Sequence, residues 1–319
     1  MKVDSEQFFS LTRNFPDLSF HQSEGSYLQK KSGKEVFFVN NQASPTVGCF
    51  GTVYKSIGIK ILRINSLCYN NPTENDLVDF LKSLCPLYDI IDLNDENAYN
   101  PYIEKSFRLA GYRKPLGQFR TDLTIIVYFD DVLKYDRSWK HNIKSANAIP
   151  DISCEEITEL TDEVIDSVAR LFKENSIQKK LSYSYTEKDL TAWMSDSKFH
   201  LYVVRLNDEI IAARIVMANG IKSYDVATAN GAKTRNVRGV THYLVDNIFN
   251  NLKEKGIKSF DFSCLPIGRK GAEGVCEFKQ GIKSGRLVQY NGPWIYTKHN
   301  YQRWILYFIN KHIRKVYEY

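Results

Sequence analysis

The loop at residues 230–239 contains residue types that bind phosphate. Lys233, Arg235 and Arg238 lie in it, and Gly239 stands directly before a predicted helix that begins at Val240. The first turn of a helix offers unpaired backbone N–H groups and the positive end of the helix dipole, and both favour an anion. A glycine would let a diphosphate approach the backbone closely, and the arginines would neutralise its charge. The loop therefore predicts an anion site, although basic residues beside a helix start also occur on solvated surfaces.

The positive charge of the chain is concentrated in its last third. The 319 residues include 43 Lys and Arg and 37 Asp and Glu, a net charge of +6. Residues 230–319 hold 16 basic and 6 acidic side chains, a net charge of +10, so residues 1–229 carry −4. An anionic ligand held by the C-terminal third explains this asymmetry, and no DNA-recognition motif accompanies it. A merely solvated basic surface is the alternative.

Composition and cysteine spacing exclude several classes of protein. Hydrophobic residues make up 43% of the chain and charged residues 25%, which excludes a disordered or collagen-like chain. The six cysteines are widely spaced and form no CxxC pair or cluster with histidine, which predicts reduced thiols in a cytoplasmic protein and no metal site. We find neither a signal-peptide pattern nor 18 consecutive apolar residues, so we expect no membrane-spanning helix.

The predicted elements that position the loop follow the same order in both halves of the chain. In the first half, three strands precede a helix and a further strand, at residues 34–39, 47–58, 59–64, 75–84 and 88–93. In the second half the same order is predicted at residues 199–206, 209–218, 221–229, 240–252 and 257–262. The turns Asn207-Asp208 and Asn219-Gly220 indicate an antiparallel meander. Each half is thus predicted to be a mixed α/β unit whose helix crosses over the sheet.

The last predicted helix has an apolar stripe with basic neighbours. The stripe consists of Tyr301, Trp304, Ile305, Phe308, Ile309, Ile313 and Val316. The basic residues beside it are Arg303, Lys311, Arg314 and Lys315. We favour a helix docked on the protein core, and a helix resting on an anionic lipid surface is the alternative.

Several motifs resemble the FemAB family and stand in the order of that family. GYRKPLGQFRTDLTIIVYF (111–129) and SWKHNIKSANA (138–148) resemble the strand and basic helix that end the family's first domain. KGIKSFDF (255–262) resembles its KGxxxxDF strand, and GVCEFKQGIKSGRLVQYNGPW (274–294) resembles its closing GLxxFKxGFGG segment. SFHQSEGSYL (19–28) looks like its opening motif. The loop is similar to the [QR]xxGx[GA] acyl-CoA cradle of GNAT acyltransferases at Asn236, Gly239 and Thr241.

The resemblance implies a fold of two tandem GNAT-like domains. We expect them at residues 1–150 and 151–319, each a mixed, mainly antiparallel sheet flanked by helices. A substrate cleft would lie between them, and the last residues would pack back on the first domain.

The resemblance also implies an activity. Family members transfer an acyl or aminoacyl group from a thioester or an aminoacyl-tRNA to an amine of a cell-wall precursor. We expect an N-acyltransferase that uses acetyl-CoA or another acyl-CoA, on a precursor of the cell wall or of surface polysaccharide. A diphosphate-linked or lipid-linked acceptor, and contact with a membrane surface, would fit the basic charge.

Two other functions stay open. The first is a tRNA-dependent aminoacyl transferase of the peptidoglycan-bridge type. Residues 161–195 are too few for the helical arm of tRNA-binding members, which favours acyl-CoA without excluding tRNA. The second is a non-catalytic member that binds a glycan or a nucleotide sugar.

Binding residues are assigned by the same resemblance. Arg235, Arg238, Gly239 and Thr241 would hold the phosphates of the donor. Lys279 matches the lysine of the family's FK motif, which contacts an anionic part of the substrate or donor. A surface lysine is the alternative for Lys279.

Acyl transfer also needs a group that takes a proton from the amine. Asp225 lies on the strand that borders the expected cleft, and strand alternation points Tyr224 to the opposite face. We predict Asp225 as the general base and Tyr224 as a substrate-binding residue. His242, in the first turn of the following helix, is a second catalytic candidate, and Asp261 is comparable. A helix-surface histidine and solvent-facing strand carboxylates are the alternatives.

Overall fold

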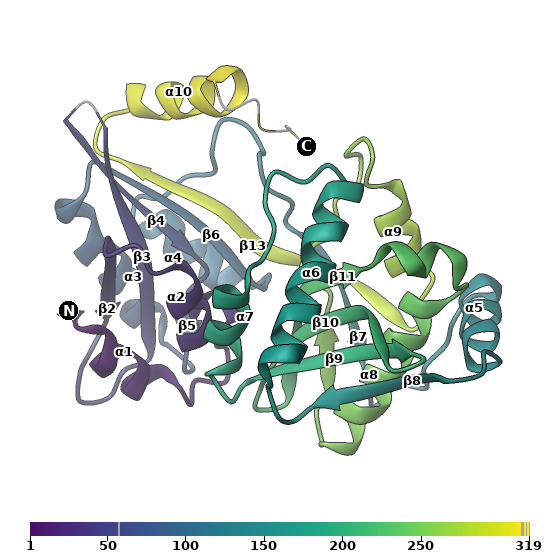
Figure 1. Ribbon diagram of the computed structural model, residues 1–319. Coiled ribbons are helices and arrows are strands. Elements are labelled where there is room, and N and C mark those ends of the chain that lie inside the picture. Colours follow the sequence, from purple (N-terminus) through teal and green to yellow (C-terminus); the bar gives the residue numbers. More distant parts are fainter. Residues whose placement is uncertain (57, 314–315, 317, 319) are drawn as a thin grey trace.

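A computed structural model describes residues 1–56, 58–313, 316 and 318, apart from the side chains of Ser56 and Arg235. In this part of the chain, 13 strands form one sheet in the order β1-β2-β3-β4-β6-β13-β7-β12-β11-β10-β9-β8, with β5 paired to β3. Most neighbours in the sheet are antiparallel, and helices flank it (Figure 1). The mixed α/β fold predicted from the sequence is thus confirmed. Ile57, Arg314 and Lys315, which were predicted within regular elements, lie outside the described residues.

The first half contains the predicted order of three strands, a helix and a strand. Its strands are β1 (Lys2–Val3), β2 (Glu35–Val39), β3 (Val47–Ser56), β4 (Ile59–Asn65), β5 (Cys68–Tyr69) and β6 (Ile90–Ala98), and its helices are α1 (Ser5–Thr12), α2 (Glu24–Lys30), α3 (Glu74–Leu84) and α4 (Pro101–Leu109). β2, β3 and β4 are antiparallel, whereas β6 returns parallel to β4 after α3. Thr73 and Asp76 form a reciprocal capping box, which fixes where α3 begins.

The second half repeats this order. Its strands are β8 (Ile152–Ile157), β9 (Phe199–Leu206), β10 (Glu209–Asn219), β11 (Lys222–Asn230) and β12 (Ser259–Asp261), and its helices are α6 (Asp162–Gln178), α7 (Glu187–Met194), α8 (Val240–Glu254) and α9 (Glu273–Gln280). β9, β10 and β11 form the predicted antiparallel meander, and β12 returns parallel to β11 after α8. A short 3-10 helix, η3 (Ala232–Asn236), lies between β11 and α8.

Strand β13 (Gly285–Thr297) joins the two halves. Its first residues pair with β7 (Leu123–Tyr128), which in turn pairs with β12. From Tyr290 onward β13 pairs instead with β6 of the first half. A register shift between Tyr290 and Gly292 accompanies this change of partner, and Gly292 has a φ of +75°.

Three buried clusters hold the layers together. One packs α6 and α7 on β9–β11 and extends to α1 and β2 of the first half. A second packs α8 and α5 (Arg137–Asn147) on β7 and β12, and a third packs α3 and α4 on β4 and β6. Figure 1 shows α6 on the near face of β9–β11. Because the first cluster contains residues from both halves, their relative placement is fixed by apolar packing as well as by β13.

The last helix, α10 (Tyr301–Phe308), is not docked in the way we favoured from the sequence. It continues as a π-helical turn (Ile309–Ile313), and Tyr301, Trp304 and Phe308 of its apolar stripe are exposed. The opposite face, at Gln302, Arg303 and Tyr307, contacts the rest of the protein. The core-docking interpretation is therefore wrong for this stripe. In the described ranges, no helix is long and apolar enough to cross a membrane.

Candidate active site

The parallel strands β11 and β12 separate in the middle of the second half. They pair at three positions, the last of which joins Tyr224 to Asp261. Beyond this pair β11 continues to Asn230, whereas the segment that follows β12 turns at Ser263, whose φ is +64°. The Ser263 hydroxyl donates to the backbone oxygen of Asp225 at 2.7 Å. This separation of two strands leaves one side of β11 without a neighbouring strand.

Two cavities lie beside the last strand pair. The β11 cavity has a volume of about 230 Å³. It is lined by residues 225–228 of β11, by residues 262–264 after β12, and by side chains from the end of α6 and the following loop, between residues 172 and 185. The interdomain cavity, of about 390 Å³, is lined by Tyr224 and Asp261 and, from the first half, by residues that include Glu96. Tyr224 and Asp225, which alternation points to opposite faces, therefore line different cavities.

Asp225 is held by a buried arginine of the adjacent strand. Arg214 Nε donates to Oδ1 of Asp225 at 2.8 Å, and its Nη2 donates to Oδ2 at 2.7 Å. Arg214 is almost fully buried, and its Nη1 has no hydrogen-bond partner among the described residues. Both carboxylate oxygens accept from the guanidinium of Arg214, so Asp225 is the ion-pair partner of this buried arginine.

Sequence reasoning missed Arg214. It is a single charged residue in the otherwise apolar strand EIIAARIVMA, and an arginine is rarely buried in such a strand without a partner. That isolated charge lies on the strand paired with the one that carries Asp225, so it was a usable signal for a buried ion pair.

Lys279 binds the segment that follows β12. Its Nζ donates to the backbone oxygen of Phe262 at 2.8 Å and also to that of Cys264. The side chain is buried, and burial lowers the pKa of its ammonium group, while the nearby charge of Asp225 raises it. The two carbonyls use two of its three N–H donors. Lys279 thus joins a buried ammonium group to two residues that line the β11 cavity.

Asp261 is the buried carboxyl group of the interdomain cavity. It accepts from the hydroxyl of Thr124 at 2.5 Å, from the hydroxyl of Tyr290 at 2.9 Å and from the backbone N–H of Ser263 at 2.8 Å. Burial raises the pKa of Asp261 to about 6, although these hydrogen bonds oppose the shift. A carboxyl group with such a pKa can take up a proton near neutral pH, which suits a general base.

His242 lies away from these groups, at an interface between helices. Its ring packs edge-on against Trp139 of α5 and Phe278 of α9, with centroid distances of 4.7 and 5.0 Å. Burial lowers the pKa of His242 to about 4, so the ring is neutral at pH 7. No hydrogen bond or ion pair in the described part joins it to Asp225. The two residues that we predicted as catalytic are therefore not brought together.

The predicted phosphate cradle is covered by helix α5. Gly239 precedes α8 with a φ of +85°, and a methyl group at this position would overlap the backbone carbonyl of Asn142. Arg238 donates through Nε to the side-chain oxygen of Asn142 at 3.1 Å, and Thr241 donates to Asn230 at 3.1 Å. The Arg235 side chain lies outside the described part. Gly239 thus allows two helices to approach, and the described residues do not fit a diphosphate at this helix start.

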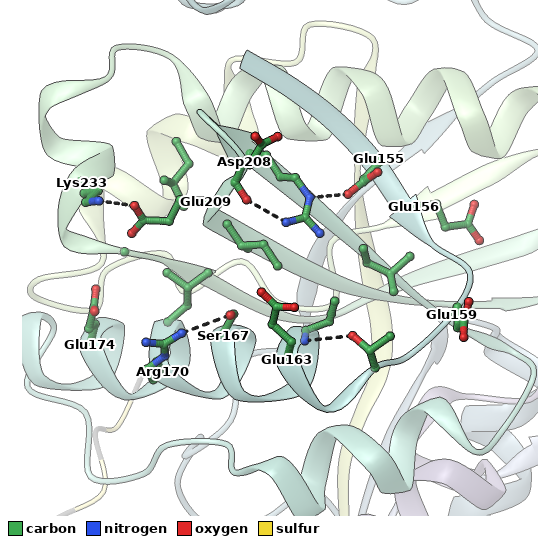
Figure 2. A pocket seen from close by; sticks show the side chains of 18 of the residues that line it. Glu155, Glu156, Glu159, Glu163, Ser167, Arg170, Glu174, Asp208, Glu209 and Lys233 are labelled. Atoms are coloured by element: carbon green, nitrogen blue, oxygen red, sulfur yellow. Dashed lines mark hydrogen bonds and ion pairs between the residues drawn. The ribbon is translucent and has the colours of Figure 1, made fainter. Parts of the chain in front are cut away.

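An acidic cavity of about 690 Å³ lies beside the same loop (Figure 2). Its charged lining residues are Glu155, Glu156, Glu159, Glu163, Glu174, Asp208 and Glu209, together with Arg170, Arg205 and Lys233. Arg205 pairs with Glu155. Lys233 pairs with Glu209, as Figure 2 shows. The remaining carboxylates leave an excess of negative charge, which would repel the phosphates of coenzyme A.

Comparisons with known proteins agree with this architecture. Residues 137–280 match the family described as "Acetyltransferase (GNAT) domain". No curated protein sequence gives a significant match.

Solved structures match over nearly the whole chain. FemX has a TM-score of 0.72 at 12% identity, covering 96% of this chain and 98% of its own. L-PGS from Bacillus licheniformis has a TM-score of 0.66 at 14% identity, covering 96% of both chains. The C-terminal domain of a putative lysylphosphatidylglycerol synthetase from Agrobacterium fabrum has a TM-score of 0.65 at 11% identity, covering 96% of this chain and 95% of its own. At these identities the matches describe the fold. Residues 137–280 match a GNAT-type acetyltransferase domain, and the chain as a whole shares the fold of these solved structures.

Proposed function

We propose that the protein transfers an acyl group between substrates bound in its two cavities, with the acceptor amine in the interdomain cavity and the donor carbonyl in the β11 cavity. The observation that carries this proposal is the last pair of β11 and β12. Tyr224 and Asp261 of this pair line the first cavity, and the residues that follow them line the second. Two substrates could therefore meet where the strands separate.

The charges around each cavity support these roles. Asp17, Glu96 and Asp261 line the interdomain cavity together with Lys222, which pairs with Asp17. The carboxyl groups are in excess, and this favours an amine. Asp261 would take the proton as the amine nitrogen attacks the carbonyl carbon. The bond between that carbon and the donor's leaving atom would then break, and the leaving group would depart with a proton. Lys279 would stabilise the negative charge that develops on the carbonyl oxygen, because its buried ammonium group donates to the backbone oxygens of Phe262 and Cys264, which line the β11 cavity.

The donor that we propose is an aminoacyl ester of tRNA rather than the acyl-CoA favoured by the sequence. The observation behind this change is α5, whose Asn142 carbonyl lies against Gly239 at the start of α8. GNAT domains in general take acyl-CoA, yet here the helix start that would receive its diphosphate is covered. The names of two structural relatives, a FemX and a putative lysylphosphatidylglycerol synthetase, are in keeping with aminoacyl transfer. We propose a precursor of the cell envelope, in the cytoplasm, as the acceptor.

A transfer assay with two labelled donors tests the proposal. The purified protein would be incubated with a UDP-amino-sugar precursor pool and either radiolabelled aminoacyl-tRNA or radiolabelled acetyl-CoA. We expect label to pass to the acceptor from tRNA alone. Transfer from acetyl-CoA alone would overturn the donor assignment but leave acyl transfer intact. If neither donor reacts, yet a nucleotide sugar raises the melting temperature, the protein is a non-catalytic binding member.

A further inference from the structure

Helix α10 lies at the periphery of the molecule (Figure 1), and its exposed face carries aromatic and aliphatic side chains. We call this face the α10 surface, and it consists of Tyr301, Trp304, Ile305, Phe308 and Ile313. Trp304 is 65% exposed and Phe308 is 57% exposed. The spacing of these residues places them on one side of the helix and of the π-helical turn that follows. A contiguous exposed surface of large apolar side chains is typical of an interaction site.

The opposite face of α10 fixes its orientation. Gln302 is buried, and Arg303 donates through Nη2 to the backbone oxygen of Lys114 at 2.8 Å. The ring of Tyr307 packs on Phe119, with 5.8 Å between centroids. These contacts hold the helix on the protein by its more polar face. The large apolar side chains are therefore turned outward by packing.

Basic residues flank the α10 surface along the chain. Lys298 and Lys311 are exposed, as are His299 and His312, whose rings pack on Tyr301 and Phe308. From residue 298 to the end of the sequence Glu318 is the single acidic residue, and it pairs with Lys311 at 3.0 Å. Positive charge around aromatic side chains is complementary to a surface that is apolar inside and negatively charged outside.

We propose that the α10 surface docks the protein on the surface of a bilayer that contains anionic phospholipid. The aromatic side chains would enter the boundary between headgroups and acyl chains, and the basic residues would contact phosphate groups. A second copy of the chain fits less well, because two such basic surfaces would repel each other. The helix and its π-helical turn are much shorter than the ~20 residues that a membrane-spanning helix needs, so the contact would be peripheral.

Vesicle binding tests this proposal without any acyl donor or acceptor, so its outcome is independent of the proposed catalysis. Trp304 is the exposed member of the four tryptophans, because Trp139, Trp193 and Trp294 are buried. Vesicles of phosphatidylcholine with about one quarter phosphatidylglycerol should therefore shift the tryptophan emission to shorter wavelength. They should also sediment the protein, whereas pure phosphatidylcholine should do so more weakly. An unchanged emission spectrum, with no sedimentation on either vesicle, would overturn the proposal.

A matched pair of variants assigns the effect to this surface. Trp304→Ser/Phe308→Ser should weaken sedimentation with anionic vesicles by about tenfold or more, since two large apolar groups no longer leave water. Val132→Ser/Ile177→Ser removes two exposed apolar side chains elsewhere and should leave binding unchanged. Equal loss in both variants would contradict the proposal. So would a change of the first variant from dimer to monomer in analytical ultracentrifugation without any loss of vesicle binding, because the surface would then join two copies.

Discussion

Replacing Asp261 by Asn should change how the stability of the protein depends on pH. The buried carboxyl group has a pKa of about 6, against an ordinary value of 3.8. At 1.36 kcal/mol per pH unit, this difference means that ionised Asp261 costs the folded state about 3 kcal/mol near pH 8. Asn has the same shape and no charge, but its amide has one acceptor oxygen where the carboxylate offers two to Tyr290, and this loss costs about 1 kcal/mol. We therefore expect Asp261→Asn to be more stable by about 2 kcal/mol near pH 8.

The sign of the pH dependence follows from proton binding. Between the two pKa values the folded protein binds more protons at this site than the unfolded chain does, so lowering the pH through this range stabilises the wild type. The advantage of Asp261→Asn should therefore disappear by about pH 4 and become a deficit of about 1 kcal/mol at still lower pH, a total change of about 3 kcal/mol. Other titrating groups are common to both proteins and do not affect this difference.

Urea unfolding followed by circular dichroism at several pH values measures this difference. Asp166→Asn, at an exposed site on α6, is the matched control and should show no such change. If the free energy of unfolding of Asp261→Asn differs from that of the wild type by the same amount at every pH, burial does not raise the pKa of the carboxyl group. If the variant is less stable throughout, hydrogen bonds from Thr124 and Tyr290 outweigh the cost of burying the charge.

Two further predictions concern the contacts around the site. Gly239→Ala should destabilise the protein by about 3 kcal/mol, because φ is +85° and the methyl group would overlap the Asn142 carbonyl. Gly220→Ala, at a turn with open space around it, should cost about 1 kcal/mol. Equal losses in urea unfolding would show that α5 does not cover the start of α8. Arg214→Met and Asp225→Asn should each cost about 3 kcal/mol, because each leaves a buried group without its partner, and the double variant should cost less than their sum. Additive losses in that double-mutant cycle would contradict the buried pair.

Local sequence patterns were sufficient for most of the fold. Thr73 with Asp76 and Thr186 with Asp189 mark the starts of α3 and α7, because each pair forms a capping box. The β10–β11 hairpin lies where the Asn-Gly pair predicts it, although its two-residue turn is Gly220–Ile221 and Asn219 is still paired with Lys222. These signals act over a few residues and need no tertiary contact.

The outward face of α10 could not be predicted in this way. Periodicity shows that Tyr301, Trp304 and Phe308 share one side of the helix, but it does not show which side the protein covers. That side is decided by the contacts of Arg303 with Lys114 and of Tyr307 with Phe119, which are distant in sequence.

The same limit applies to the candidate site. Strand alternation correctly separates Tyr224 from Asp225, because it depends on backbone geometry alone. A glycine before a helix, however, looks the same whether a ligand or another helix approaches it. Gly239 meets Asn142, which lies 97 residues earlier in the chain, so the contact leaves no local signal. The division of the chain near residue 150 stays a prediction.

The rate of acyl transfer by Lys279→Met tests the central claim most directly. The control is Lys283→Met, which replaces an exposed lysine of the same segment. Circular dichroism and thermal unfolding would first establish that both variants are folded. We predict that Lys279→Met loses about 100-fold or more in rate, because the buried ammonium group no longer stabilises the developing negative charge. Lys283→Met should keep the wild-type rate. A folded Lys279→Met variant that transfers the acyl group as fast as the control would contradict our assignment of the site.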